Sequence, residues 1–280
     1  MQNPPRLTDT QALSRHRARA LRAPAMFLQD LAADEVQERL LDVNKRFTAP
    51  AVVSPFPQVW APRLPGARIV PDADVLALEP GAHDLVIHAL CLHWANDPVG
   101  QIVQCRRALR PDGLFLAVLF GGQTLAELRA SLAEAESRLT GGLSPRVLPM
   151  GEIRDLGALL QRGGLALPVA DALMQRTSYA SAFHLMRDLR AMGETSALAA
   201  RPRRFAPRAL FAEAARIHAE NFPAEDGRVA ATFEMIFLTG WAPDDSQPKP
   251  LRPGSATHRL ADALRTVERP LPESPAKPED

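Results

Sequence analysis

The sequence predicts an α/β protein with a largely parallel sheet. Residues 84–90 and 114–120 are apolar runs of strand length, which is typical of strands buried on both faces. A helix with clear start signals lies between them, because Asp97 can cap its first turn and Pro98 suits its first position. Strand–helix–strand alternation of this kind indicates parallel strands joined by crossover helices.

The remaining elements can be assigned in chain order. Helical spacing covers residues 8–46 with a break near Pro24, and the turn residues at 110–113 end the helix over 97–109. Further helices are predicted at 122–139, 150–162, 180–192 and 207–221. Strands are predicted at 51–54, 67–70, 165–178 and 231–241, and we expect one late strand to run antiparallel to the others.

These elements suggest three regions. Residues 1–46 form an N-terminal helical segment, and residues 47–260 form the main domain, with a helical insertion at about 180–222. The end of the chain is rich in proline and charge, so we expect residues 261–280 to be a disordered tail.

Composition excludes several classes of protein. The net charge is +1 and aromatic residues make up 5% of the 280 residues, so we expect no nucleic-acid partner. The two cysteines are too few for a disulfide framework and fit a reducing compartment. No apolar run reaches the ~18 residues of a membrane span. Five arginines lie within residues 1–24. They indicate either the solvent-exposed face of a first helix, or else a transit peptide or a surface-binding arm.

Several segments resemble one family. ALRPDGLFLAVLF (108–120) and HDLVIHALCLHWANDP (83–98) resemble the strands and loops beside the cofactor site of class I S-adenosylmethionine (SAM) methyltransferases, which have a Rossmann-like fold. The LHW triplet at 92–94 is similar to the branch that holds the malonyl-carrier-protein methyltransferase of biotin synthesis and assembly factor 5 of respiratory complex I. Later segments resemble the assembly factor in order, at 120–136, 141–164, 185–194, 231–241 and 252–257.

The resemblance implies where SAM would bind. Ligands of such sheets lie beyond the carboxyl ends of the strands. Residues 71–86 match a family stretch in which Asp72, next to Ala73, would face the adenine amino group. Ser54 would belong to the loop after the first strand. His93 and Trp94 would belong to the loop that covers the transferred methyl group.

Three of these side chains also have a purely structural interpretation. Asp72 can be a solvated turn carboxylate, and Trp94 can be an aromatic packed on the sheet. His93 can be a structural histidine with satisfied hydrogen bonds. The sequence does not decide between these interpretations and the cofactor roles.

Chain length counts against a complete cofactor site. From Ala51 to Asp84 there are only 34 residues, whereas one strand–helix–strand unit takes about 30 residues and strands one to four need three crossovers. The second strand, with its ribose-binding acid, is therefore expected to be missing, and the first half of the fold to be truncated. Residues 54–57 read Ser-Pro-Phe-Pro where the family has glycines, and proline offers no N–H to a carboxylate.

No catalytic residue or metal ligand stands out. His83 and His88 lie five residues apart on a strand and so point to opposite faces, which disfavours a metal site. Cys91 is expected to be a buried apolar residue, because no base or helix N-terminus is evident beside it.

Two functions therefore remain open. The first is a SAM-dependent methyltransferase-family enzyme that modifies a protein side chain. The resemblance implies an arginine of complex I as the substrate, and hydroxylation as the modification associated with the assembly factor. The second is a non-catalytic scaffold for complex I assembly with a degenerate SAM site. The partner would be a complex I subunit or an assembly intermediate, and a bacterial chain would be cytoplasmic, near the membrane.

Overall fold

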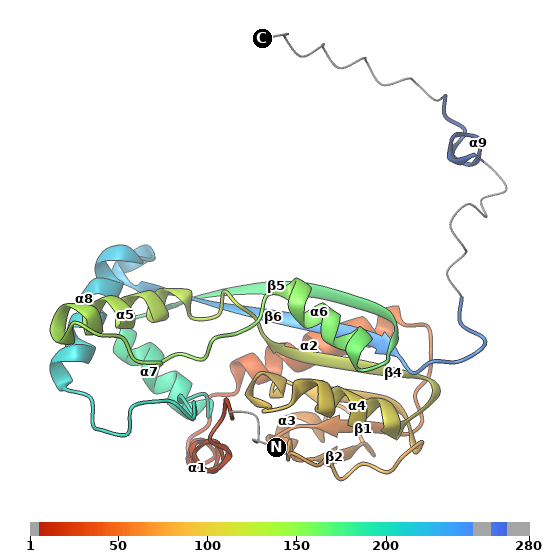
Figure 1. Cartoon of the computed structure of the whole chain (residues 1–280), viewed down its shortest axis with the longest axis horizontal. Helices are drawn as coiled ribbons and strands as arrows, with labels where there is room; N and C mark the ends of the chain where they lie inside the picture. Colours follow the sequence, from red (N-terminus) through yellow and green to blue (C-terminus); the bar gives the residue numbers. More distant parts are fainter. Residues whose placement is uncertain (1–5, 249–258, 268–280) are drawn as a thin grey trace, which may run out of the picture. The chain divides into compact units, whose positions relative to one another are not determined.

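A computed structural model describes residues 6–248 and 259–267 (Figure 1). The chain divides into two compact units, Met1–Asp245 and Ser246–Asp280. The second unit holds α9 (Leu260–Leu264) in its described part. The segment resembling the family at 252–257 and residues 268–280 of the expected tail lie outside the described residues.

The first unit is built on one six-stranded sheet of order β2-β1-β3-β4-β6-β5. Its strands are β1 (Pro50–Val53), β2 (Arg68–Val70), β3 (His83–Ala89), β4 (Leu109–Phe120), β5 (Ala166–Tyr179) and β6 (Val229–Trp241). The first four strands pair in parallel, and β6 runs antiparallel to both β4 and β5. The predicted α/β class, with a mostly parallel sheet and one late antiparallel strand, is confirmed.

Helices cover both faces of this sheet. They are α1 (Thr10–Ala20), α2 (Phe27–Asp42), α3 (Pro57–Trp60), α4 (Pro98–Ala108), α5 (Ala126–Thr140), α6 (Ile153–Arg162), α7 (Ala182–Ala191) and α8 (Arg208–Asn221), with short 3-10 turns η1 (Leu92–Trp94) and η2 (Glu225–Gly227). Buried residues of α2, α3, α5, α7 and α8 share a core on one face, and those of α4 and α6 share a core on the other. Figure 1 shows α5, α7 and α8 together at one end, with α1 beside α7.

Strand β3 shows why the apolar runs are buried on both faces. Leu85 and Ile87 pack into the core under α2, whereas Val86 between them packs into the core under α4. Alternation of side chains along a strand produces this division. Helix α4 begins as expected, because the Asp97 carboxylate accepts a 2.8 Å hydrogen bond from the N–H of Gly100.

The segment 110–113 ends α4 as predicted, but it does not form a separate turn. It lies inside β4, where the pairing register jumps from His83 opposite Leu109 to Leu85 opposite Leu114. Asp112 takes a positive φ of 57° at this irregularity. Pairing with β3 therefore continues on both sides of these turn-forming residues.

A single strand, β2, separates β1 from β3 in the sequence. The fully described residues 54–67 contain only α3, and β2 pairs directly with β1, with Val53 opposite Val70. The strand that precedes Asp72 therefore occupies the position next to β1, and the expected second strand is absent from this part of the chain. The truncation predicted from chain length is confirmed.

Candidate functional site

The carboxyl ends of β1, β2 and β3 meet at one edge of the sheet, and hydrogen bonds connect the loops that follow them. The N–H of Ser54 donates to the carbonyl of Val70 at 2.9 Å, and the Gln101 side chain donates to the carbonyl of Ala73 at 2.7 Å. The predicted positions 54, 72, 73, 93 and 94 therefore lie in neighbouring loops at this edge, as the topology of parallel strands requires.

The loop after β1 offers no backbone N–H to a ligand between residues 54 and 57. The N–H of Ser54 is used by Val70, and the N–H of Phe56 donates to the Ser54 hydroxyl at 3.1 Å. Residues 55 and 57 are prolines and have no N–H. The Phe56 ring is fully buried in the core beneath α2. Glycine loops bind anionic groups through such N–H groups, so this loop lacks that means of binding.

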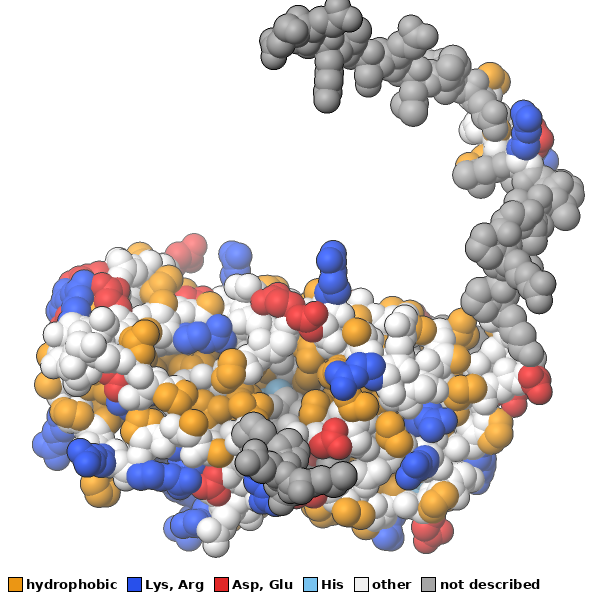
Figure 2. Space-filling model, viewed as in Figure 1, with side chains coloured by type: hydrophobic (Ala, Val, Ile, Leu, Met, Phe, Trp, Pro, Cys, Tyr) orange, Lys and Arg blue, Asp and Glu red, His pale blue; other side chains and the backbone are white. Residues whose placement is uncertain are grey.

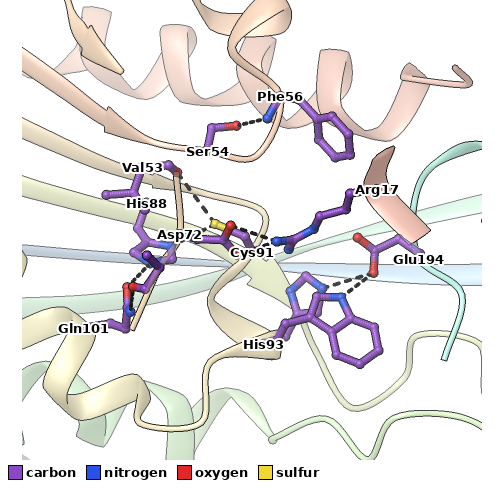
Figure 3. Close-up of polar contacts among 12 residues, drawn as sticks. Arg17, Val53, Ser54, Phe56, Asp72, His88, Cys91, His93, Gln101 and Glu194 are labelled. Atoms are coloured by element: carbon purple, nitrogen blue, oxygen red, sulfur yellow. Dashed lines mark hydrogen bonds and ion pairs between the residues drawn. The ribbon is translucent and has the colours of Figure 1, made fainter. Parts of the chain in front are cut away.

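Asp72 is paired inside the protein (Figure 3). One guanidinium nitrogen of Arg17, Nη1, lies 2.8 Å from Oδ1 and 2.7 Å from Oδ2 of the carboxylate. The two side chains are only 11% and 13% exposed. Asp72 is therefore neither free for a ligand nor solvated, which excludes the turn-carboxylate interpretation.

Close packing holds Arg17 in this place. Gly193 has a φ of +83°, and a methyl group added to it would lie 3.2 Å from Cγ of Arg17 and 3.3 Å from Cζ of Phe56. The backbone at Gly193, just after α7, therefore packs closely against both side chains. A side chain at position 193 would have a strained backbone and would crowd both neighbours, so glycine suits both the conformation and the space.

His93 and Trp94 both donate to the same buried carboxylate, that of Glu194. Trp94 Nε1 lies 2.7 Å from Oε2, and His93 Nε2 lies 3.3 Å from the same oxygen. Burial opposes the charged form of Glu194, yet hydrogen bonding to His93, the charge of Arg17 and the bond from Trp94 together lower the pKa of this carboxyl. Figure 3 shows Glu194 and Arg17 on the same side of His93. His93 is buried and its Nδ1 has no hydrogen-bond partner among the described residues, so its bonds are only half satisfied.

Cys91 is buried, as expected, but a base does lie beside it. His88 Nδ1 is 3.4 Å from Sγ, and His88 Nε2 is 3.1 Å from the Gln101 side-chain oxygen. Burial raises the pKa of the Cys91 thiol well above its usual value and lowers the pKa of His88 to about 4. Both groups are therefore neutral near pH 7, which disfavours a thiolate nucleophile.

A cavity of about 300 Å³ lies beyond the carboxyl end of β4. Apolar side chains from β4, α5, α7, α8 and β6 line it, among them Phe120, Leu128, Leu189, Phe211 and Phe233. Trp94 and Glu194 also line it, and Arg146, Arg190 and Arg201 add positive charge. Figure 2 shows hydrophobic side chains gathered in a hollow on this face. The volume is at the lower end of the range for small-ligand sites.

SAM does not fit the residues at the sheet edge. Its methionine end finds no free N–H at residues 54–57, and Phe56 fills the core beside them. The carboxylate of Asp72 is held by Arg17, and β2 is a single strand between β1 and β3 in the sequence, where the family pattern has two. Ser54, Asp72 and Ala73 line neither this cavity nor the one beside α6.

The described parts of the chain hold neither a cluster of metal ligands nor a helix that could span a membrane. Within residues 6–248 and 259–267, no group of three or more His, Cys, Asp or Glu side chains is placed to hold a metal ion. No helix in these ranges is long and apolar enough to cross a bilayer.

Comparison with known proteins relates this chain to methyltransferases. Residues 35–117 match the family described as "Methyltransferase domain". The phosphoethanolamine N-methyltransferase 2 of Haemonchus contortus, solved with S-adenosylhomocysteine, superposes with a TM-score of 0.41 at 15% identity, covering 77% of this chain and 53% of that chain.

The curated relatives are more specific. "Arginine-hydroxylase NDUFAF5, mitochondrial" of Danio rerio is 37% identical over 199 residues, which are 71% of this chain and 62% of that protein. The malonyl-[acyl-carrier protein] O-methyltransferase of Xylella fastidiosa is 34% identical over 215 residues, 77% of this chain and 66% of that protein. By sequence, the chain is related to methyltransferase-family proteins, among them the complex I assembly factor that its sequence resembles. It spans about three fifths of the length of the first NDUFAF5 relatives.

Sequence reasoning did not identify two residues of this edge. Arg17 lies in a helix 55 residues before Asp72, and Glu194 lies 100 residues after Trp94. No local motif connects either residue to its partner. The one available signal was the glycine at 193, which marks a backbone position with positive φ beside Glu194.

Proposed function

We propose that this chain serves the assembly of respiratory complex I by binding a protein partner, without taking up SAM. The relation to NDUFAF5 supports the assembly role. The chain spans only part of the length of those relatives. Its partner and its activity are therefore proposed here and not taken over from them. The partner we expect is a complex I subunit or an assembly intermediate.

One observation carries the proposal. The loop after β1 has no free backbone N–H at residues 54–57, and the acid that would face adenine is already paired with Arg17. A methyltransferase needs these two groups for its cofactor, whereas a partner-binding protein does not. The residues Ser54, Asp72, Ala73, His93 and Trp94 then serve to close the sheet edge and to position Glu194.

A second candidate is modification of an arginine side chain, the activity named for the NDUFAF5 relatives. The cavity beside the sheet edge favours it. A buried carboxylate, Glu194, lies at an apolar cavity with an aromatic wall that includes Trp94. Such surroundings suit the insertion of one long, positively charged side chain from a partner.

Deletion and complementation in the source organism test the proposal. We expect loss of the chain to reduce assembled complex I on native gels, and the full chain to restore it. Cells are then grown with methionine labelled in its methyl group. A label that appears on a complex I subunit only in the presence of the chain would contradict the proposal.

Mass spectrometry distinguishes the second candidate, modification of an arginine, from binding alone. A chain-dependent mass increase of one oxygen atom on a complex I arginine would indicate hydroxylation. The same subunits without any chain-dependent change would indicate binding alone. A variant with Arg216→Ala, which removes only two surface ion pairs on α8, is the matched control for expression and folding.

The cytoplasmic location is proposed on the same basis. The NDUFAF5 relatives are mitochondrial by name, and for a bacterial chain we propose the cytoplasm. Fractionation of cells that express the tagged chain tests this, together with washing of the membranes at high salt to release a peripherally bound form.

A further inference from the structure

Strand β5 is a long edge of the sheet. Within the described residues it has β6 as its one neighbour, and Figure 1 shows it along the rim of the first unit. The strand at the other edge, β2, has only 3 residues, whereas β5 has 14. From Val169 to Tyr179 it pairs with β6 without a register shift, and this stretch contains neither proline nor lysine, which commonly protect an edge.

We propose that two copies of this chain pair antiparallel along β5. The two-fold axis lies at Ala172, and Met174 of each copy enters the cavity beside α6 of the other copy. The pairing uses none of the residues on which the proposed function rests, so it goes beyond that function.

The hydrogen bonds of β6 show which backbone groups of β5 point to the free edge. In an antiparallel sheet, alternate residues of a strand bond to opposite neighbours. The carbonyl of Glu234 accepts from the N–H of Gly121, which directly follows β4, so the next residue, Met235, bonds toward β5. Leu173 lies opposite Met235 and therefore bonds to β6. The even-numbered residues of β5, from 170 to 178, thus direct their N–H and C=O groups outward.

One end of this edge is already occupied by side chains. The carbonyl of Arg176 accepts a bond from the Gln175 side chain at 3.1 Å, and the carbonyl of Ser178 accepts one from Arg228 at 2.6 Å. Among the described residues, no bond from a side chain or from a loop reaches the outward groups of residues 170, 172 and 174. These three residues therefore offer three N–H and three C=O groups to a further strand.

A single symmetric register pairs all of these groups with one another. With Ala172 opposite its own copy, Ala170 lies opposite Met174 of the other copy. Three N–H donors in each of two copies then give six hydrogen bonds. An axis at Leu173 would instead place Ala170 opposite Arg176, whose carbonyl is occupied. The edge is therefore complementary to itself, as a two-fold interface requires.

The side chains fit the same register. The cavity beside α6 has a volume of about 440 Å³, and the small residues Gly157, Ala158 and Ala170 are among those that line it. Met174 of the other copy lies opposite Ala170 on the same face of the sheet. In the single chain Met174 is 44% exposed. Its flexible side chain can fill an irregular cavity, and the contact occurs twice. This reciprocal fit favours a second copy over a strand of another protein.

Sedimentation velocity of the full chain over a range of concentrations tests the pairing. We expect the 30.5 kDa monomer to give way to a species of twice that mass as concentration rises. Ala172→Pro should remain monomeric, because it removes the central N–H at an edge position where proline is tolerated. Met174→Ala should raise the dissociation constant about a hundredfold, since each copy loses a buried methionine.

The surface control Arg216→Ala should dimerise like the wild type, and circular dichroism checks that Ala172→Pro is folded. A monomer at every concentration would overturn the proposal and leave the edge to a strand of another protein. A dimer that persists in folded Ala172→Pro would also overturn it, because the contact would then lie on another face.

Cysteine cross-linking tests the register without a proline. In Ala172→Cys the two new thiols face each other across the axis, with Cα atoms about 5.5 Å apart. Arg176→Cys is the matched control, because its copy lies eight residues along the strand, roughly 27 Å away. The native Cys91 and Cys105 are buried. A short bismaleimide should link Ala172→Cys into dimers and leave Arg176→Cys unlinked. Equal linking of the two variants would contradict the register.

Discussion

Nη1 of Arg17 lies 2.8 and 2.7 Å from the two carboxylate oxygens of Asp72, 55 residues away along the chain. This pair connects the N-terminal helix to the loop after β2, at the edge where a methyltransferase holds its cofactor. The same arginine contributes to the environment of Glu194 and packs near Gly193. Side chains of the protein itself therefore occupy this edge of the sheet.

Removing Arg17 should be costly, because Asp72 would be left as a buried charge without a partner. We expect Arg17→Ala to lower the free energy of unfolding by about 3 kcal/mol. For a chain of this size, that corresponds to a fall in melting temperature of roughly 10 °C. Scanning calorimetry of the variant against Arg216→Ala, which loses only exposed ion pairs, measures the difference. Equal melting temperatures for the two variants would show that the Arg17–Asp72 pair contributes nothing particular.

Phe56 should matter for stability but should not by itself restore a cofactor site. The ring is fully buried, so Phe56→Ala is expected to cost about 3–5 kcal/mol through lost burial and the cavity left behind. Urea unfolding measures this loss. The variant should still show no heat of binding with SAM, because the prolines on either side and the paired Asp72 remain. Binding of SAM to Phe56→Ala would mean that the ring alone blocks the site.

His88 should make stability depend on pH between about 4 and 7. Burial lowers its pKa from 6.5 to about 4 in the folded protein. The unfolded chain takes up the proton below pH 6.5 while the folded imidazole stays neutral, so protonation favours unfolding in this window. The stability is fully present above pH 6.5, and about 2 kcal/mol of it is lost between pH 7 and pH 5.

The variant His88→Gln isolates this effect. It keeps a polar side chain near Gln101 and cannot titrate. Urea midpoints at pH 7 and pH 5 should differ less in the variant than in the wild type. Burial also lowers the pKa of His16. Because His16 is present in both proteins, its contribution to the pH dependence cancels in the comparison. An identical pH dependence in the two proteins would show that His88 takes up its proton equally in both states.

Glu136 should hold one wall of the cavity in place. Its carboxylate accepts four hydrogen bonds, from the N–H and hydroxyl of Ser144 and from Nε and Nη2 of Arg146. Arg146 and its neighbours 145, 147 and 148 line the cavity. We expect Glu136→Ala to speed amide exchange over residues 144–148 and to leave the β3 strand protected. Unchanged exchange there would mean that apolar packing alone fixes the wall.

The sequence predicted the fold well because its signals are local. The apolar runs at 84–90 and 114–120 are strands buried on both faces, and Asp97 with Pro98 begins a helix as expected. Chain length showed that one strand–helix unit was missing, which the direct pairing of β1 with β2 confirms. The segment 110–113 was the exception, because pairing with the neighbouring strands absorbed its turn residues into β4.

The site was less predictable because its contacts are long-range. The sequence placed Ser54, Asp72, Ala73, His93 and Trp94 at the correct edge of the sheet, since each follows a parallel strand. Their cofactor roles remain predictions. The sequence did not show that Arg17 and Glu194 occupy the same edge, because side chains 55 and 100 residues from their partners are brought there only by tertiary packing.

Isothermal titration of the full chain with SAM tests the central claim most directly. The malonyl-[acyl-carrier protein] O-methyltransferase of Xylella fastidiosa serves as the positive control under the same conditions. With no free N–H at residues 54–57 and with Asp72 held by Arg17, we expect no heat of binding up to millimolar SAM. Micromolar binding that disappears in Asp72→Ala, with the variant still folded, would contradict the account and indicate a working cofactor site.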